Sequence, residues 1–390
     1  MFGPVLTGWF RTSFNEAFPM TSGQGIDRRL AREVVHGRRL RDLRSSQELP
    51  GHELRLFVQA VAARVGTPRA KNHSGADGHL SREGAMQIRR RLAAEESIVF
   101  ETRERPGDEW EISDATTVLG HRSAFAPSWE VERALASGAV EGDLVLPFHP
   151  LSFRDFMLYE QHNIGAARGY VGRYRPGVAR LARVYETVTR SVFPAFRPKP
   201  LWYRQPIYYM SNATTIVPSG TPVRTPHYTK ALDYELELAF VLGRPLLDAS
   251  PAEAERAIAA FVVLCDFSAR DVQIPEMDSG FGPQKAKHFV TSLSSTAVSA
   301  SEVLPRWTEL RSEVTINGES VAKPDASRPR WSLGEMLAHA SASEQLLPGE
   351  LFATGTFAGG SGMEIGRWLK PGDFLRLDIG GVGTIEHRIL

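Results

Sequence analysis

The sequence has little of what marks secreted, membrane or nucleic-acid-binding proteins. Its one cysteine, Cys265, cannot form a disulfide within the chain, and no N-terminal stretch combines a basic start with a long apolar segment. The longest apolar run, at residues 257–265, is far shorter than the roughly 18 residues of a membrane span. The formal net charge is only +1, which gives no electrostatic reason for a nucleic-acid or membrane partner. Together these features predict a globular, cytoplasmic protein.

The sequence patterns of several well-known active sites are also missing. There is no Gly-x-Ser-x-Gly elbow, no paired Cys-x-x-Cys, no His-Glu-x-x-His and no glycine-rich phosphate loop. The glycine-dense stretch at residues 359–362 does not have phosphate-loop spacing. A nucleotide-dependent enzyme is therefore not expected.

The first part of the chain differs in composition from the rest. Residues 27 to about 92 are rich in arginine and read as helical, because apolar residues recur at helical spacing (Leu54, Phe57, Val58, Val61 and Val65). Short strand-like pieces follow, up to the proline-flanked segment at residues 144–147. We place a domain boundary there. It separates a smaller, partly helical N-terminal region (residues 1–143), whose role is unknown, from a larger domain (residues 144–390).

The larger domain alternates short strands, tight turns and a few well-capped helices. Ser250 and Ser332 each stand three residues before a glutamate, which predicts a capping box at the start of two short helices. Asn317 and Gly318 lie between two strand-like segments and predict a two-residue hairpin. Sheets joined by hairpins, with helices on one side, predict the α+β class.

Two glutamates at residues 233–242 are the first candidates for chemistry. The segment has strand composition, and its period of two places Glu235 and Glu237 on one face. On an arbitrary strand such a face is commonly solvated, and two carboxylates there would be ordinary. Here residues 239–242 continue as an unbroken apolar run, which indicates burial on both faces. Two carboxylates about 6 Å apart would repel by roughly 3 kcal/mol at an effective dielectric of 20, and a cation would turn that cost into affinity.

A third carboxylate, Asp266, ends the next apolar strand-like segment at residues 261–266. Taken alone, it would more often be a helix cap or the partner of an arginine. Three acidic groups at strand positions, with no histidine or cysteine close by, favour a hard cation over zinc. The expected cofactor is a divalent metal, Mg²⁺ or Ca²⁺, with Mn²⁺ as a further candidate.

Four motifs resemble, in family order, those of the fumarylacetoacetate hydrolase superfamily. LDYELE at residues 232–237 is similar to its metal-binding strand, and DFSARDVQ at residues 266–273 is similar to its second signature. GPQKAKHF at residues 282–289 resembles its lysine-bearing loop, and ATGT at residues 353–356 resembles its substrate-side glycine–threonine turn. The resemblance covers residues 152–390 and implies the β-rich C-terminal domain of that family, a mixed β-sandwich or roll.

The resemblance extends to residues 152–162 and implies further site residues. In the fumarylacetoacetase-like members a metal-binding aspartate and a catalytic histidine have the separation that Asp155 and His162 have here. A lone histidine is more often structural, but this motif favours His162 as the base. The family's glutamate beyond the glycine–threonine turn corresponds to Glu364, which would orient the imidazole. The implied metal ligands are Asp155, Glu235, Glu237 and Asp266.

The same resemblance implies residues that contact the substrate. Lys287, Arg270 and Gln273 match positions that bind substrate or stabilise developing negative charge. Tyr209 matches a substrate-contacting tyrosine, although a half-buried aromatic on a strand edge explains it equally well. The remaining substrate-side residues are Gly355 and Thr356.

The implied reaction is hydrolysis of a carbon–carbon bond in a 1,3-diketone or acylpyruvate. Water activated by the histidine would attack one carbonyl, and the metal would act as a Lewis acid on the leaving enolate. Decarboxylation, isomerisation and hydration of 2-keto acids use the same scaffold and stay open as alternatives, and a non-catalytic scaffold is a further one. The expected partner is a small keto acid or diketone, and the expected assembly is a homodimer.

One position departs from the fumarylacetoacetase-like pattern. Met157 stands where those members place a tyrosine. A thioether is at best a weak hydrogen-bond acceptor and offers a flexible apolar wall. We therefore expect the pocket to prefer a bulkier or less polar group than the one in fumarylacetoacetate.

Overall fold

The computed structural model describes residues 86–94, 97–114, 128–136 and 138–390. Its helices are α5 (Ser128–Ala136), α6 (Glu160–Tyr174), α7 (Pro176–Thr189), α8 (Pro251–Glu255), α9 (Arg270–Asp278), α10 (Ala300–Val303), α11 (Leu333–Ser341) and α12 (Gly362–Ile365). Its strands are β1 (Gln87–Ala93), β2 (Ser97–Arg103), β3 (Glu111–Ile112), β4 (Leu144–Val145), β5 (Phe153–Phe156), β6 (Tyr208–Ser211), β7 (Ile216–Pro218), β8 (Leu232–Asp233), β9 (Leu236–Leu242), β10 (Ile258–Asp266), β11 (Ser268–Ala269), β12 (Thr291–Leu293), β13 (Thr296–Ser299), β14 (Ser312–Ile316), β15 (Glu319–Ala322), β16 (Leu351–Ala353), β17 (Phe374–Ile379) and β18 (Gly383–Arg388).

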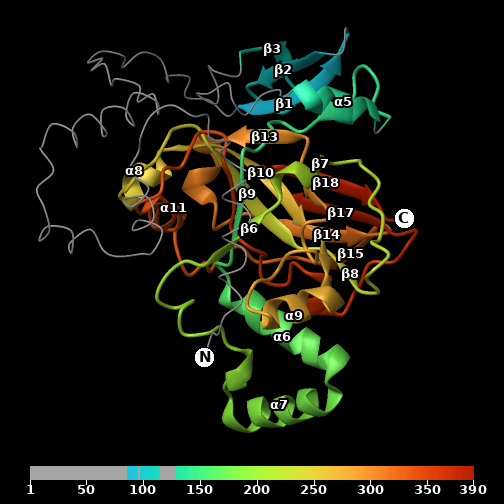
Figure 1. Ribbon diagram of the computed structural model, residues 1–390, viewed down its shortest axis with the longest axis vertical. Coiled ribbons are helices and arrows are strands. Elements are labelled where there is room, and N and C mark those ends of the chain that lie inside the picture. The colour runs from blue at the N-terminus through green and yellow to red at the C-terminus, as the bar shows by residue number, and fades with distance from the viewer. Residues whose placement is uncertain (1–85, 95–96, 115–127, 137) are drawn as a thin grey trace, which may run out of the picture. The chain divides into compact units, whose positions relative to one another are not determined.

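The largest sheet of the described residues has the strand order β3-β2-β1-β13-β10-β9-β16-β5-β6, with β4, β7 and β12 attached beside this path (Figure 1). The pairs β16–β5 and β12–β7 are parallel, whereas β9 and β10 run antiparallel along most of their length. Every residue of β9 is buried. The prediction of burial on both faces at residues 239–242 is therefore confirmed.

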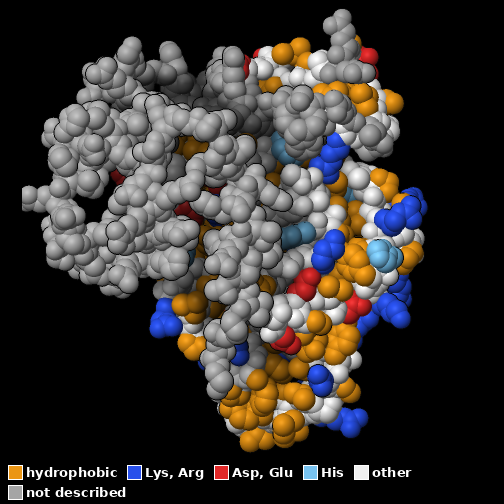
Figure 2. Space-filling view, viewed as in Figure 1, with side chains coloured by type: hydrophobic (Ala, Val, Ile, Leu, Met, Phe, Trp, Pro, Cys, Tyr) orange, Lys and Arg blue, Asp and Glu red, His pale blue; other side chains and the backbone are white. Residues whose placement is uncertain are grey.

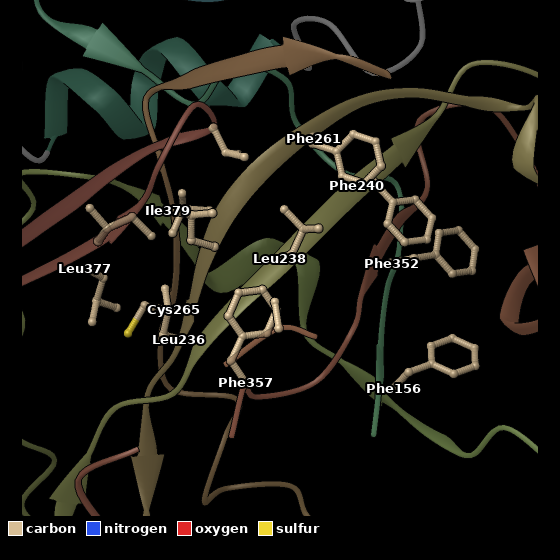
Figure 3. Packing of buried hydrophobic residues seen from close by; sticks show 14 of the residues in the cluster. Phe156, Leu236, Leu238, Phe240, Phe261, Cys265, Phe352, Phe357, Leu377 and Ile379 are labelled. Atoms are coloured by element: carbon tan, nitrogen blue, oxygen red, sulfur yellow. The ribbon is translucent and has the colours of Figure 1, made fainter. Parts of the chain in front are cut away.

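A second sheet, with the order β15-β14-β17-β18, contributes to the main core. Leu236, Leu238 and Cys265 lie beside Leu377 and Ile379 in this core (Figure 3). Each fully buried aliphatic side chain of this kind stabilises the fold by about 1.5–3 kcal/mol relative to its exposed state. Because this packing holds β9 and β10 in place, it also fixes the positions of the side chains at the ends of these strands.

The local elements predicted in the larger domain are confirmed. Ser250 and Ser332 each accept the backbone N–H of the glutamate three residues later, so both capping boxes are complete. Asn317 and Gly318 join β14 to β15 with φ values of 56° and 83°, the left-handed conformation that a tight hairpin needs. The α+β class is likewise confirmed, because the sheets are joined by hairpins and carry separate helices.

The prediction of helix up to residue 92 is wrong at its end, and residues 27–85 lie outside the described part. Gln87–Ala93 form strand β1, in which Ile88, Arg90 and Leu92 alternate as buried residues. The buried arginine hid this alternation, because its guanidinium is satisfied by distant partners: it donates to Glu130 at 2.6 Å and to the Leu146 carbonyl at 2.7 Å. β1 pairs with β13, across the predicted boundary at residues 143/144, and the division into two domains stays a prediction.

Helix α7 packs mainly through Ala182, against Ile164 and Phe196, and not against the sheets. Apolar side chains are exposed on its outer face (Val178, Leu181, Val184 and Val188). A hydrophobic patch is visible at this position, at the bottom of Figure 2. No helix in the described residues is long and apolar enough to cross a membrane.

Candidate active site

Three buried carboxylates meet where strands of the large sheet end. Asp155 lies on β5, Glu237 on β9 and Asp266 at the end of β10. The pairing of β16 with both β5 and β9, and of β9 with β10, brings these positions to one edge. One oxygen or more from each carboxylate lies within 4.8 Å of the others, a separation that suits ligands of a single ion.

The chemistry of this cluster fits a divalent cation. Asp155 Oδ1, Glu237 Oε2 and Asp266 Oδ1 are buried and accept no hydrogen bond from the described residues. Burial, and then repulsion from neighbouring carboxylates, raises the pKa of Asp155 and that of Glu237 well above the usual range. Buried carboxylates with free oxygens and mutual repulsion are stabilised by a hard cation with oxygen ligands. The residues present therefore fit the expected group.

Glu235 lies beside this cluster but is held by basic side chains. Its Oε1 accepts from Arg270 at 2.7 Å, and its Oε2 accepts from Lys287, whose ammonium also donates to Asp266 at 2.5 Å. Burial would raise the pKa of Glu235, but Arg270 and then Lys287 outweigh burial and hold that pKa well below its usual range. Glu235 is thus paired with two protein cations, whereas Asp266 shares one of them, Lys287.

His162 faces both this cluster and a carboxylate behind it. Its Nδ1 lies 2.8 Å from Glu364 Oε2, and its Nε2 lies 3.4 Å from Glu235 Oε1. Burial would lower the pKa of His162, but the two carboxylates raise it to about 9. Glu364 also accepts from the backbone N–H groups of Gly359 and Ser361 and from the Ser361 hydroxyl. The ring is therefore fixed by a carboxylate that is itself immobilised.

The contact between His162 and Glu364 depends on the close approach of α6 to α12. A Cβ atom at Gly169 would lie 1.9 Å from the carbonyl oxygen of Met363, and one at Gly165 would lie 2.7 Å from Glu364 Oε1. Neither glycine was among the predicted site residues, although the spacing of two glycines four apart on a helix is a visible sign of close packing. The capping box Ser361–Glu364, also missed, follows the same Ser-x-x-Glu rule as the two boxes that were predicted.

Arg270 and Gln273 form one polar row on α9. Arg270 donates to Asp233 at 2.8 Å and to Gln273 Oε1 at 2.9 Å. Asp233 also accepts from the backbone N–H of Met363, so it ties α9 to α12. Sequence reasoning did not single out Asp233, although it is the second residue of the LDYELE motif.

The remaining predicted site residues line the same cavity, which has a volume of about 400 Å³. Tyr209 donates to Asp266 at 2.8 Å, and Thr356 donates to Glu237 at 3.2 Å. Gly355 has a φ of +81°, and a Cβ there would lie 2.4 Å from the carbonyl oxygen of Phe156, so only glycine lets this turn approach β5. Met157 is half-buried at the cavity wall.

Comparisons with known proteins agree with this architecture. The family described as "Fumarylacetoacetate (FAA) hydrolase C-terminal" matches residues 178–390, more than half of the chain. Asp155, Met157 and His162 lie upstream of that match. The chain is 29% identical over 185 residues to the mitochondrial oxaloacetate tautomerase FAHD1 of Bos taurus, which covers 47% of this chain and 81% of the relative. It is 28% identical over 188 residues to the mitochondrial oxaloacetate tautomerase fahd2 of Xenopus laevis, with 48% and 59% covered.

Two solved structures share the fold. The 2-hydroxyhepta-2,4-diene-1,7-dioate isomerase of Mycobacterium marinum is similar with a TM-score of 0.50 and 20% identity, over 78% of this chain and 98% of that one. The 5-carboxymethyl-2-hydroxymuconate delta-isomerase of Mycobacterium smegmatis is similar with a TM-score of 0.52 and 18% identity, over the same shares. At these identities the likeness concerns the fold alone.

Proposed function

The chain belongs to the fumarylacetoacetate hydrolase family, and from this premise we propose that it is a metal-dependent hydrolase that cleaves a carbon–carbon bond in a 1,3-diketone or acylpyruvate. The relatives and structural neighbours include enzymes named as tautomerases and isomerases. The family is thus enzymatic, and the choice of reaction is the proposal. The observation that carries it is the contact of 2.8 Å between His162 and Glu364 at the edge of the carboxylate cluster.

His162 is the proposed general base. Because a carboxylate oxygen can only accept, Nδ1 carries a proton toward Glu364. In the neutral ring Nε2, which lies 3.4 Å from Glu235 Oε1, then has the lone pair that takes a proton from water. A base must be neutral before it acts, and positive charge beside the carboxylates would lower the raised pKa of His162 toward that state. Glu364 then stabilises the imidazolium that forms.

Asp155, Glu237 and Asp266, with Glu235 as the fourth ligand, are the proposed holders of the cation. Mg²⁺, Mn²⁺ and Ca²⁺ are the candidates, since all the donors are oxygens. When bound, such a cation supplies Lewis-acid stabilisation of the negative charge that develops on the substrate.

Lys287, Arg270 and Gln273 are proposed to stabilise negative charge on the departing carbon fragment. Burial alone would lower the pKa of Lys287, but Asp266 and Glu235 raise it, so the ammonium stays charged. Fixed donors that face a site of developing charge lower a barrier without reorganisation. Tyr209, Met157, Gly355 and Thr356 complete the proposed substrate contacts at the cavity surface.

Tautomerisation of a 2-keto acid is the second candidate. The naming of two relatives at 28–29% identity as oxaloacetate tautomerases favours it. The same histidine would then move a proton between carbon and oxygen of the substrate, with no attack by water. Decarboxylation and hydration remain further alternatives on these residues.

Product analysis separates the candidates. The full chain is incubated with Mg²⁺, Mn²⁺ or Ca²⁺ and with an acylpyruvate or oxaloacetate, and the mixture is followed by NMR. Hydrolysis adds water across the bond and yields pyruvate and one carboxylic acid from the acylpyruvate. Faster keto–enol exchange without new products would overturn the hydrolase proposal in favour of a tautomerase, and release of carbon dioxide from oxaloacetate without acylpyruvate cleavage would favour a decarboxylase.

The homodimer and the cytoplasmic location stay predictions of the sequence. Light scattering on the purified chain tests the first, with a mass of about twice 43.2 kDa as the expected result. Fractionation of cells that express the chain tests the second.

A further inference from the structure

The cavity has two chemically different ends. The carboxylates, Lys287 and Arg270 occupy the end at the sheet. Residues of the helices α6 and α9, together with Met363 of α12, form the walls away from it. The wall residues at this second end are mostly apolar: Ala166, Ala167, Tyr170, Ile274, Met277 and Met363.

The change from polar to apolar follows the length of both helices. On α6 the residues that line the cavity run from His162 and Asn163 at the helix start through the two alanines to Tyr170. On α9 they run from Arg270 and Gln273 to Met277. The spacing of three and four keeps each set on one helix face, and at 1.5 Å per residue the walls extend about 10–12 Å from the charged end. A small keto acid would fill only the charged end.

Among the described lining residues, the apolar end offers no cation to a second carboxylate. Among the described lining residues the permanent cations are Arg270 and Lys287, and both lie at the charged end. Arg270 is paired with Asp233 and Glu235, and Lys287 with Glu235 and Asp266. A carboxylate between Ile274 and the alanines of α6, which are partly buried, would lose part of its hydration without gaining a cation, which is unfavourable.

We propose that the substrate is a monocarboxylate whose remote end is an uncharged alkyl or aryl group held between α6 and α9. The assignment of the reacting keto-acid end to the carboxylate cluster rests on the proposed function. The apolar end rests on the lining of the cavity. The volume of about 400 Å³ lies in the range of pockets that enclose a medium-sized organic ligand, which leaves room for such a group.

Binding of unreactive analogues tests this without turnover. The full chain, supplied with Mn²⁺, is titrated by calorimetry with 2-oxobutanoate, 2-oxopentanoate and 2-oxohexanoate, and with the matched dicarboxylate 2-oxoadipate. Affinity should rise about twofold to fourfold with each methylene. The dicarboxylate should bind more weakly than 2-oxohexanoate. Equal affinities along the series, or tighter binding of 2-oxoadipate, would refute the apolar pocket.

A charge placed in the wall sharpens the test. Ile274→Arg puts a cation at the apolar end and should reverse the preference, so that 2-oxoadipate binds more tightly than 2-oxohexanoate. Val184→Arg adds the same charge on the exposed face of α7, outside the cavity, and should leave the preference as it is. The same preference in Ile274→Arg as in the unmodified chain would contradict the proposal.

Failure of this inference is distinct from failure of the proposed function. Affinity that rises with chain length in a protein that cleaves no acylpyruvate would support the apolar pocket and overturn the hydrolase. Cleavage of acylpyruvates with no effect of the remote group on binding or kcat/KM would support the hydrolase and overturn the apolar pocket.

Discussion

The charged end of the cavity, called the floor below, consists of His162 and the carboxylates around it. Both the floor and the packing around His387 bury a histidine, but the floor favours the charged form of the ring and the packing around His387 favours the neutral form. At the floor His162 lies between two carboxylates that raise its pKa to about 9, and neighbouring acids keep oxygens without hydrogen bonds from the described residues. His387 instead bonds the Thr221 carbonyl at 2.6 Å and the Ser292 hydroxyl at 2.7 Å, and burial lowers its pKa to about 4. Burial alone therefore does not mark a functional group, whereas a buried cluster with uncompensated charge does.

The largest effect is expected on metal affinity, when one carboxylate of the floor is neutralised. Glu237→Gln removes a proposed metal ligand, and Mn²⁺ affinity measured by calorimetry should fall by more than about 100-fold, beyond what loss of an outer contact costs. The same change relieves repulsion from Asp155 and Asp266, so the metal-free protein should gain about 0.5–2 kcal/mol in free energy of unfolding.

A matched control for this change is Glu319→Gln, which neutralises an exposed glutamate on β15. It should alter neither metal affinity nor stability. Unchanged Mn²⁺ affinity in Glu237→Gln would contradict the assignment of Glu237 as a metal ligand.

The second effect concerns His387, the buried neutral histidine, and the pH dependence of the free energy of unfolding. The folded pKa of His387 is about 4, below the ordinary value of 6.5, so its contribution to stability is complete above about pH 6.5 and is lost as the pH falls through 4. The loss should be about 3 kcal/mol, at 1.36 kcal/mol per pKa unit. Urea unfolding of the natural chain and of His387→Gln between pH 7 and pH 4 measures it. The variant should show a correspondingly weaker pH dependence, and identical profiles would show that His387 does not titrate in this way.

The third effect tests how His162 is positioned. Gly169→Ala places a Cβ against the Met363 carbonyl and should push α6 away from α12, with a loss of about 100-fold in kcat/KM if His162 shifts by about 1 Å. Gly172→Ala lies on the same helix with no atom within 4 Å of its Cβ. It should keep activity and add up to about 1 kcal/mol of stability. Equal activity in the two variants would mean that the close approach does not position the base.

The smallest effect belongs to the cavity wall. Met157→Tyr supplies a hydroxyl that could bond a polar substrate group, a gain of about 1 kcal/mol or roughly fivefold in kcat/KM for fumarylacetoacetate. The natural chain should turn that substrate over poorly and prefer a diketone with an alkyl or aryl group. Efficient turnover of fumarylacetoacetate by the natural chain, with no gain from the tyrosine, would show that Met157 does not shape specificity.

The sequence predicted the strands of the floor better than it predicted their surroundings. The alternation around Glu235 and Glu237 and the apolar run after them follow from local periodicity, so β9 and its burial could be predicted. The contact of Gly169 with Met363 joins residues almost two hundred positions apart, and no local pattern specifies which helix lies across a glycine face. Strand β1 was misread for a related reason, because the partners that let Arg90 be buried, Glu130 and the Leu146 carbonyl, are distant in the sequence.

Of the apolar side chains that line the cavity, only Met157 was predicted from the sequence. Ala166 and Ile274 belong to different helices, and each by itself has the composition of an ordinary helix face. Only the tertiary arrangement brings them to one wall. Sequence motifs therefore specify the reacting end of such a site more readily than the end that selects the substrate.

The most direct test of the account is His162→Asn measured with two readouts. Asparagine preserves size and polarity but cannot act as a base at neutral pH. Turnover of an acylpyruvate should fall by about 10²–10⁴-fold, while Mn²⁺ affinity by calorimetry stays within about twofold of the natural chain. Full hydrolytic activity in His162→Asn, with the metal still bound, would contradict the central claim that this histidine activates the water.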